Sequence, residues 1–118
     1  MSGGDGAMAL SELADLFGVL SHPDRVRLLQ ELRGGARDVA SLVMALGISQ
    51  SRTSQHLGLL KAHHLVQAKR EGRRVYYHLR DEALAAWILQ GLVFLDGHRA
   101  SLGESIEALS QRYGSEAQ

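Results

Sequence analysis

Residues 49–74 carry the side chains with the clearest chemistry, which is the binding of a polyanion. Hydroxyl, amide, guanidinium and imidazole groups gather in residues 49–56, and four basic residues lie close to Gly72. Guanidinium groups pair with guanine, side-chain amides pair with adenine, and cationic side chains neutralise phosphates. The sequence contains no Gly-rich phosphate loop, no HExxH pattern and no nucleophile beside an evident base. These residues therefore predict a nucleic-acid-binding protein and not an enzyme.

The formal charge of the chain is unevenly distributed, although its net value is zero. Residues 37–80 hold eight Lys and Arg against two acidic residues, a balance of +6, whereas residues 1–36 carry −2 and residues 81–118 carry −4. A basic middle segment favours a polyanionic partner at that place. The alternative interpretation is a solvated hairpin that exposes many arginines.

The elements that must position these groups begin with four helices, which apolar spacing and capping residues predict. The first two cover about 9–20 and 23–33, and the next two cover about 38–46 and 49–63. Each of the last two begins at a residue type suited to N-capping, an aspartate and a serine. Gly47 separates them by a tight turn, which makes them a helix-turn-helix pair.

A β-hairpin is predicted directly after the fourth helix. Its strands cover about 65–69 and 75–79, and the turn at 70–74 contains Gly72, which tolerates positive φ. Alternation in the second strand indicates one packed face and one free face. From about residue 81 the chain returns to a helical pattern, so the fold class is mainly α with a small β-hairpin (α+β).

The last helix carries an apolar stripe longer than the core of so small a domain requires. Its members are spaced by three, four or seven residues and begin at Leu84 and Ile88. Such a stripe predicts helix-to-helix packing in a dimer. The alternative is a helix that lies across its own domain. Gly97 is a point at which the helix could kink or split.

The length of 118 residues predicts a single domain over residues 9–113, with flexible tails at 1–8 and 114–118. The first six residues are small and polar and do not form a signal peptide, and no run of apolar residues approaches a membrane span. The chain has no cysteine, which excludes disulfides and thiolate metal ligation. We expect a cytoplasmic protein.

The chain resembles the ArsR/SmtB family of bacterial winged helix-turn-helix repressors in three segments: LSHPDRVRLLQEL (20–32), VASLVMALGISQSRTSQHLGLLKAHHLV (39–66) and REGRRVYYHL (70–79). The resemblance implies a winged helix-turn-helix of order α-α-α-α-β-β-α, which dimerises through its first and last helices. It also implies a repressor that binds an inverted-repeat operator in double-stranded DNA and releases it when an effector binds.

The resemblance also implies which residues meet DNA and which meet the second protomer. The recognition helix would be 49–62 and the wing 67–79. The implied DNA-binding residues are Ser49, Gln50, Ser51, Arg52, Ser54, Gln55, His56, Arg70, Arg73 and Arg74. The implied dimer interface consists of Leu13, Phe17, Leu84, Ile88, Leu92, Leu95, Leu102 and Ile106.

The sequence departs from the family at both of its well-known metal sites. Where a Cys-x-Cys pattern would begin the third helix, this chain has Asp38 and Ala40. At the site on the last helix, Asp81 matches, but Ala83 replaces the first histidine, and a phenylalanine and a glycine fall where the later ligands would be. We therefore expect no cofactor and no standard metal site.

Two alternatives for the effector remain open. One is a metal-responsive repressor for zinc or nickel, with a non-standard site formed in a dimer by Asp96, His98 and Glu104. The other is a small-molecule-responsive regulator. Among the remaining histidines, His22 precedes a proline and is interpreted as a helix cap.

Overall fold

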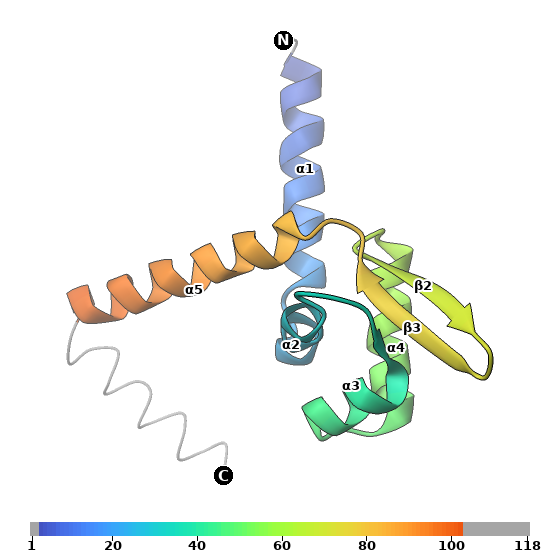
Figure 1. The fold of residues 1–118 in the computed structure, drawn as a ribbon. Helices are drawn as coiled ribbons and strands as arrows, with labels where there is room; N and C mark the ends of the chain where they lie inside the picture. Colours follow the sequence, from blue (N-terminus) through green and yellow to red (C-terminus); the bar gives the residue numbers. More distant parts are fainter. Residues whose placement is uncertain (1–2, 103–118) are drawn as a thin grey trace. The chain divides into compact units, whose positions relative to one another are not determined.

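The computed structural model describes residues 3–102 of the chain, which form five helices and three short strands (Figure 1). The chain divides into two compact units between Ala85 and Ala86. The first unit contains the helix-turn-helix and the hairpin, and the second contains most of the last helix. Within the described residues, no helix is both long and apolar enough to cross a membrane.

The first two helices are α1 (Gly3–Val19) and α2 (Pro23–Glu31). The α1 helix begins about six residues earlier than the sequence predicted, because that prediction placed the glycines near the N-terminus in a flexible tail. Pro23 occupies the start of α2, and the His22 side chain caps this helix by accepting the N–H of Asp24, as interpreted from the sequence.

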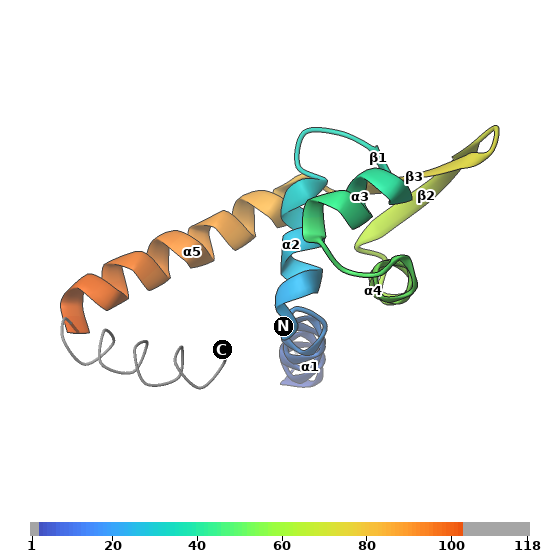
Figure 2. The same ribbon diagram turned by 90° about the horizontal axis from the view of Figure 1, so that it is seen from below.

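The helix-turn-helix pair consists of α3 (Val39–Leu46) and α4 (Gln50–Ala62), and Figure 2 shows the turn between them. Asp38 caps α3 by accepting the N–H of Ser41, and Ser49 caps α4 by accepting the N–H of Arg52. Gly47 ends α3 with a φ of 69°, a left-handed conformation that suits glycine. All three features confirm the sequence prediction.

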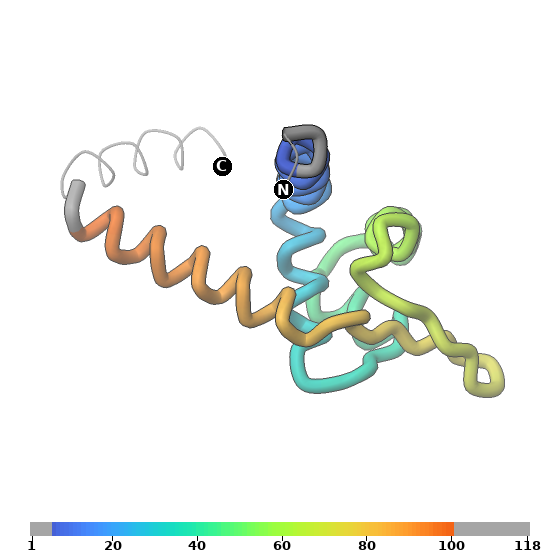
Figure 3. Tube along the Cα trace, turned by 90° about the horizontal axis from the view of Figure 1, so that it is seen from above, coloured from blue at the N-terminus to red at the C-terminus, as the bar shows by residue number. Residues whose placement is uncertain are grey.

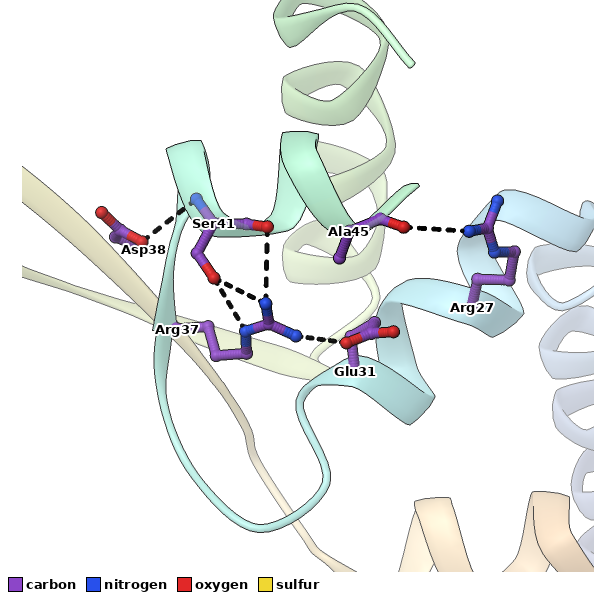
Figure 4. Close-up of polar contacts among 6 residues, drawn as sticks. All are labelled: Arg27, Glu31, Arg37, Asp38, Ser41 and Ala45. Atoms are coloured by element: carbon purple, nitrogen blue, oxygen red, sulfur yellow. Dashed lines mark hydrogen bonds and ion pairs between the residues drawn. The ribbon is translucent and has the colours of Figure 1, made fainter. Parts of the chain in front are cut away.

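Two arginines join α2 to α3 (Figure 4). Arg27 donates to the carbonyl of Ala45 at 3.1 Å and to that of Leu46 at 3.2 Å, which satisfies carbonyls at the end of α3. Arg37 donates to the Glu31 carboxylate and to the Ser41 hydroxyl. These arginines therefore act within the fold, although Arg37 belongs to the basic segment counted from the sequence.

The strands β2 (Val66–Glu71) and β3 (Arg74–Leu79) form an antiparallel hairpin that projects away from the helices (Figures 1 and 3). Their register pairs Glu71 with Arg74, so the turn is tighter than the predicted 70–74. Gly72 adopts a φ of 64° in that turn, as predicted.

A third strand, β1 (Arg37–Asp38), pairs with β3 and gives the sheet the order β1-β3-β2. The sequence did not predict β1, since two residues are too few to show a period of two. Because β3 is the central strand, Tyr76 and His78 are half-buried, and the predicted free face of this strand is only partly free.

The core of the first unit lies where α4 packs against α2, α3 and β2. Its fully buried large side chains are Leu28, Leu29, Leu32, Leu42, Leu57, Leu60, Val66 and Thr53. Full burial of one leucine side chain stabilises a fold by about 2 kcal/mol. Thr53, the polar member, donates its hydroxyl to the carbonyl of Ser49 at 2.9 Å and so adds a hydrogen bond at the start of α4.

The last helix, α5 (Ala83–Leu102), is continuous through Gly97. The Asp81 carboxylate accepts the N–H of Ala83 at 2.9 Å at the start of this helix. Several large apolar side chains of α5 are exposed in the single chain: Trp87, Leu92, Val93, Phe94 and Leu95.

Candidate nucleic-acid interface

The outer face of α4 presents the polar side chains that the sequence assigned to DNA contact. Its exposed members are Ser49, Gln50, Ser51, Arg52, Ser54 and Gln55. Thr53, Leu57 and Leu60 occupy the opposite face and are buried, as helical periodicity requires. Within residues 3–102, the side chains of Arg52 and Gln55 have no hydrogen-bond or ion-pair partner. Both are therefore available to a ligand outside the chain.

The first turn of α4 combines side-chain and backbone donors. The Ser49 hydroxyl oxygen accepts the N–H of Arg52 at 3.1 Å, which leaves its own hydrogen available for donation. The first amides of a helix lack intrahelical acceptors, and the helix dipole favours an anion beside them. This end of α4 is suited to holding a phosphate group.

The three wing arginines differ in their surroundings. Arg70 donates to the carbonyl of Gly72 at 3.3 Å, and Arg74 forms an ion pair with Asp38 at 3.4 Å. Arg73 is exposed and has no such partner in the part of the chain that the structure describes. Lys69 is paired with Glu71 at 3.6 Å. Arg73 is thus the least engaged cation of the hairpin.

A hollow of about 400 Å³ lies where the starts of α3 and α4 meet the wing. Gln50 from α4 and both Arg73 and Arg74 from the wing line it, together with Asp38, Val39, Ala40 and Val75. The Asp38 carboxylate in this hollow is already engaged with the Ser41 N–H and with Arg74. The fold therefore brings the start of α4 and the wing to one shared surface, on which Arg73 is the cation without an ion-pair partner among the described residues.

His56 is the predicted DNA-contact residue that the structure places elsewhere. Its side chain is only 12% exposed and faces α2, where its Nε2 lies 4.0 Å from the Asp24 carboxylate. Its ring centroid lies 4.5 Å from that of His22. His56 follows the buried Thr53 by three residues, so it shares the inner face of α4. That spacing was the signal in the sequence that could have placed it correctly.

Electrostatics around His56 favour the neutral imidazole. Burial lowers the pKa of His56, and the nearby His22 and Arg25 lower it further. The Asp24 carboxylate opposes this shift without overcoming it. An uncharged imidazole on the inner face of α4 contributes little attraction for phosphate.

Two of the three metal candidates named from the sequence have partners within α5. Asp96 is paired with Arg99 at 3.8 Å, and the His98 ring stacks on Phe94 at 5.7 Å between centroids. Glu104 lies outside the described residues. Asp38 caps α3 and therefore serves a structural purpose at the position of the absent Cys-x-Cys pattern.

The residues assigned to dimerisation leave exposed apolar surface on α1 and on α5. On α1, Leu13 and Phe17 are exposed, and so are Met8 and Leu10, which the sequence had not assigned. On α5, Leu92 and Leu95 are exposed, whereas Leu84 and Ile88 are half-buried. Ile106 and the side chain of Leu102 lie outside the described part.

The exposed polar face of α4 and the basic hairpin beside it define a winged helix-turn-helix protein. A family profile described as "Bacterial regulatory protein, arsR family" matches residues 22–68. The chain is 36% identical over 109 residues to the "HTH-type transcriptional regulator CmtR" of Mycobacterium bovis, with 85% of this chain and 92% of that protein covered. The chain belongs to the ArsR family of bacterial regulatory proteins.

Two further comparisons agree with this membership. The chain is 39% identical over 83 residues to the "HTH-type transcriptional repressor SmtB" of Mycobacterium tuberculosis, and the match spans 70% of this chain and 62% of that repressor's length. A solution structure of the homodimeric winged helix-turn-helix domain of Mb0332 from Mycobacterium bovis, described as a possible ArsR-family regulator, is similar with a TM-score of 0.70. That structure is 32% identical, with 83% of this chain and 90% of the other covered.

These comparisons confirm the predicted family and the predicted winged helix-turn-helix fold. They place the chain among regulatory proteins and not among enzymes.

Proposed function

We propose that the chain is a dimeric transcriptional repressor that binds an inverted-repeat operator through α4 and the wing. One observation carries the proposal: Gln50, Arg73 and Arg74 line one hollow beside the exposed face of α4. A helix and a charged hairpin so arranged suit a major groove and the adjacent backbone. The relative named as a transcriptional repressor supports the direction of regulation. Operator binding also implies a cytoplasmic location.

The proposed contacts are the polar and cationic side chains that are exposed on α4 and on the wing. Ser49 and Gln50 hold a phosphate at the start of α4, while Ser51, Arg52, Ser54 and Gln55 face base edges and nearby phosphates. Arg70, Arg73 and Arg74 meet the backbone or the minor groove. His56 is excluded from this set because it faces α2.

Dimerisation is proposed through the exposed apolar side chains of α1 and α5. Large exposed apolar patches mark interaction surfaces in proteins that are otherwise well packed. The similar Mycobacterium bovis domain is homodimeric, which supports a dimer of this chain. Two recognition helices related by a two-fold axis would then read half-sites about 34 Å apart, one turn of DNA.

The test is selection of operator sequences from random duplex DNA by the purified full chain, followed by affinity measurement. The proposal expects selected sequences with inverted repeats, and it expects Arg52→Ala to weaken binding at least tenfold. Arg33→Ala is the matched control, because this exposed arginine lies outside the proposed interface. No enrichment of any inverted repeat, or equal loss in both variants, would overturn the proposal.

A further inference from the structure

Three potential metal ligands from two helices converge behind the recognition helix. His22 and Asp24 stand at the start of α2, and His56 projects from the inner face of α4. Their ligand atoms all lie within 4.8 Å of one another. In the described part of the chain, they form the only group of three or more His, Asp or Glu side chains gathered this closely.

We propose that His22, Asp24 and His56 bind a divalent transition-metal ion that links α2 to α4. This inference rests on the proposed function and deepens it, because it supplies a regulatory ligand for the same recognition helix. Two imidazoles and one carboxylate suit Zn²⁺, Co²⁺ or Ni²⁺ better than a hard cation such as Ca²⁺. The site is separate from the Cys-x-Cys position near Asp38 and from the acidic and histidine residues of α5.

The distances are close to those of a bound site. A tetrahedral ion with metal–ligand distances near 2.0 Å places its ligand atoms about 3.3 Å apart. The Asp24 Oδ2 to His56 Nε2 distance of 4.0 Å exceeds this by less than one ångström, and none of the three ligand atoms is more than 4.8 Å from another, so a bound ion must draw these side chains closer together. All three residues are half-buried, so the cluster is not sealed from solvent.

Metal binding at this site would compete with the N-cap of α2. The Nδ1 atom of His22 now accepts the N–H of Asp24 at 3.1 Å. A neutral imidazole has one nitrogen lone pair, so it cannot accept this hydrogen bond and ligate a metal at the same time. Binding must therefore exchange the cap hydrogen bond for a metal–nitrogen bond and alter the start of α2.

Metal binding would also affect the contacts at the end of α3, through Asp24 and Arg27. Asp24 lies 3.9 Å from the guanidinium of Arg27, which also donates to the carbonyls of Ala45 and Leu46. An ion that draws the Asp24 carboxylate toward His56 weakens its pairing with Arg27. His56 is adjacent to Gln55 and one helical turn from Arg52, so the ion acts directly behind the proposed DNA-reading face.

The test uses the full chain, freed of metal, with Zn²⁺ followed by calorimetry and Co²⁺ followed by its visible ligand-field absorption. The proposal expects one ion per chain, a higher melting temperature and a tetrahedral Co²⁺ spectrum, all lost in His56→Gln and in Asp24→Asn. His98→Gln is the matched control and keeps full binding. Circular dichroism verifies that each variant is folded. If His56→Gln does not fold, Asp24→Asn alone is used to test the site.

Three results overturn the proposal, and the first two are absence of binding to the folded chain and binding that survives both site variants. Loss of binding in His98→Gln with retention in His56→Gln would move the ion to α5 and equally overturn it. Operator affinity of the metal-free chain is measured in parallel. That measurement needs no metal. If the metal site fails its test, the proposed DNA-binding function is therefore not contradicted. If DNA binding fails, the metal-binding result can still be interpreted.

Discussion

Arg74 of the wing forms an ion pair with Asp38 at 3.4 Å, and the same carboxylate caps α3. The Asp38 side chain therefore links the hairpin to the helix-turn-helix and also caps the start of α3. Asp38 is only 15% exposed, but the Arg74 side chain is 70% exposed, so solvent screens this ion pair and its contribution to stability is small. The pair holds the wing at the start of α3, beside the face of α4 that is proposed to bind DNA.

Replacement of Asp38 tests this double role. Asp38→Ala removes both the cap and the ion pair, and we expect it to lower the free energy of unfolding by about 1–2 kcal/mol. Asp38→Asn keeps a capping oxygen and should cost less than half as much. Urea denaturation of the two variants measures the difference. Equal losses would contradict the cap and assign the effect to charge.

Arg37 and Arg73 provide a matched comparison between a structural arginine and one that is proposed to face DNA. Arg37 contacts Glu31 and Ser41, so Arg37→Ala should lower the free energy of unfolding by about 1–3 kcal/mol. Arg73→Ala removes an exposed side chain and should leave stability within about 0.5 kcal/mol of the wild type. Thermal melting of both variants is the measurement. A destabilised Arg73→Ala variant would show that this residue also acts within the fold.

The pH dependence of stability should follow His56. Its folded pKa is lowered by burial, by His22 and by Arg25 and Arg52, against the Asp24 carboxylate, so the unfolded chain takes up a proton first as pH falls. The stabilising contribution of neutral His56 is therefore present above its unfolded pKa of 6.5 and is lost as pH falls through the folded value.

We expect His56→Gln to flatten this dependence. Urea denaturation between about pH 7.5 and pH 5.5, with a chelator present, compares the two chains. If His56→Gln loses as much stability as the wild type when the pH falls, the pH dependence belongs to another group.

Local chemistry explains why much of the fold was predictable from sequence. The caps at His22, Asp38 and Ser49 and the left-handed Gly47 each depend on residues within four positions of one another. The strands and helices of the winged fold follow from apolar periodicity in the same way.

Features that depend on tertiary neighbours were missed. Strand β1 exists only because β3 lies beside it, and the contacts of His56 with His22 and Asp24 exist only because α2 packs against α4. Arg37 was counted in the net charge of the basic segment, because its partners Glu31 and Ser41 are apparent only once α2 and α3 are placed. A net charge count over a segment therefore overstated the cations that are free to meet DNA.

The proposed dimer predicts a change of mass when the α5 stripe is charged. Leu92→Asp places a carboxylate on the exposed apolar surface of α5 and should convert dimers to monomers in sedimentation experiments. Met44→Asp is the control, because Met44 is 85% exposed on α3 and lies outside the proposed interface. A dimer that persists in Leu92→Asp would place the interface elsewhere.

The salt dependence of operator affinity tests the central claim most directly. Binding of the selected operator is measured over a range of salt concentrations for the wild type, Arg52→Ala, Arg73→Ala and the control Arg33→Ala. The account predicts that each of the first two variants reduces the slope of log affinity against log salt by about one, since each removes one phosphate contact or nearby charge. Wild-type slope and affinity in both Arg52→Ala and Arg73→Ala would contradict the assignment of α4 and the wing to DNA.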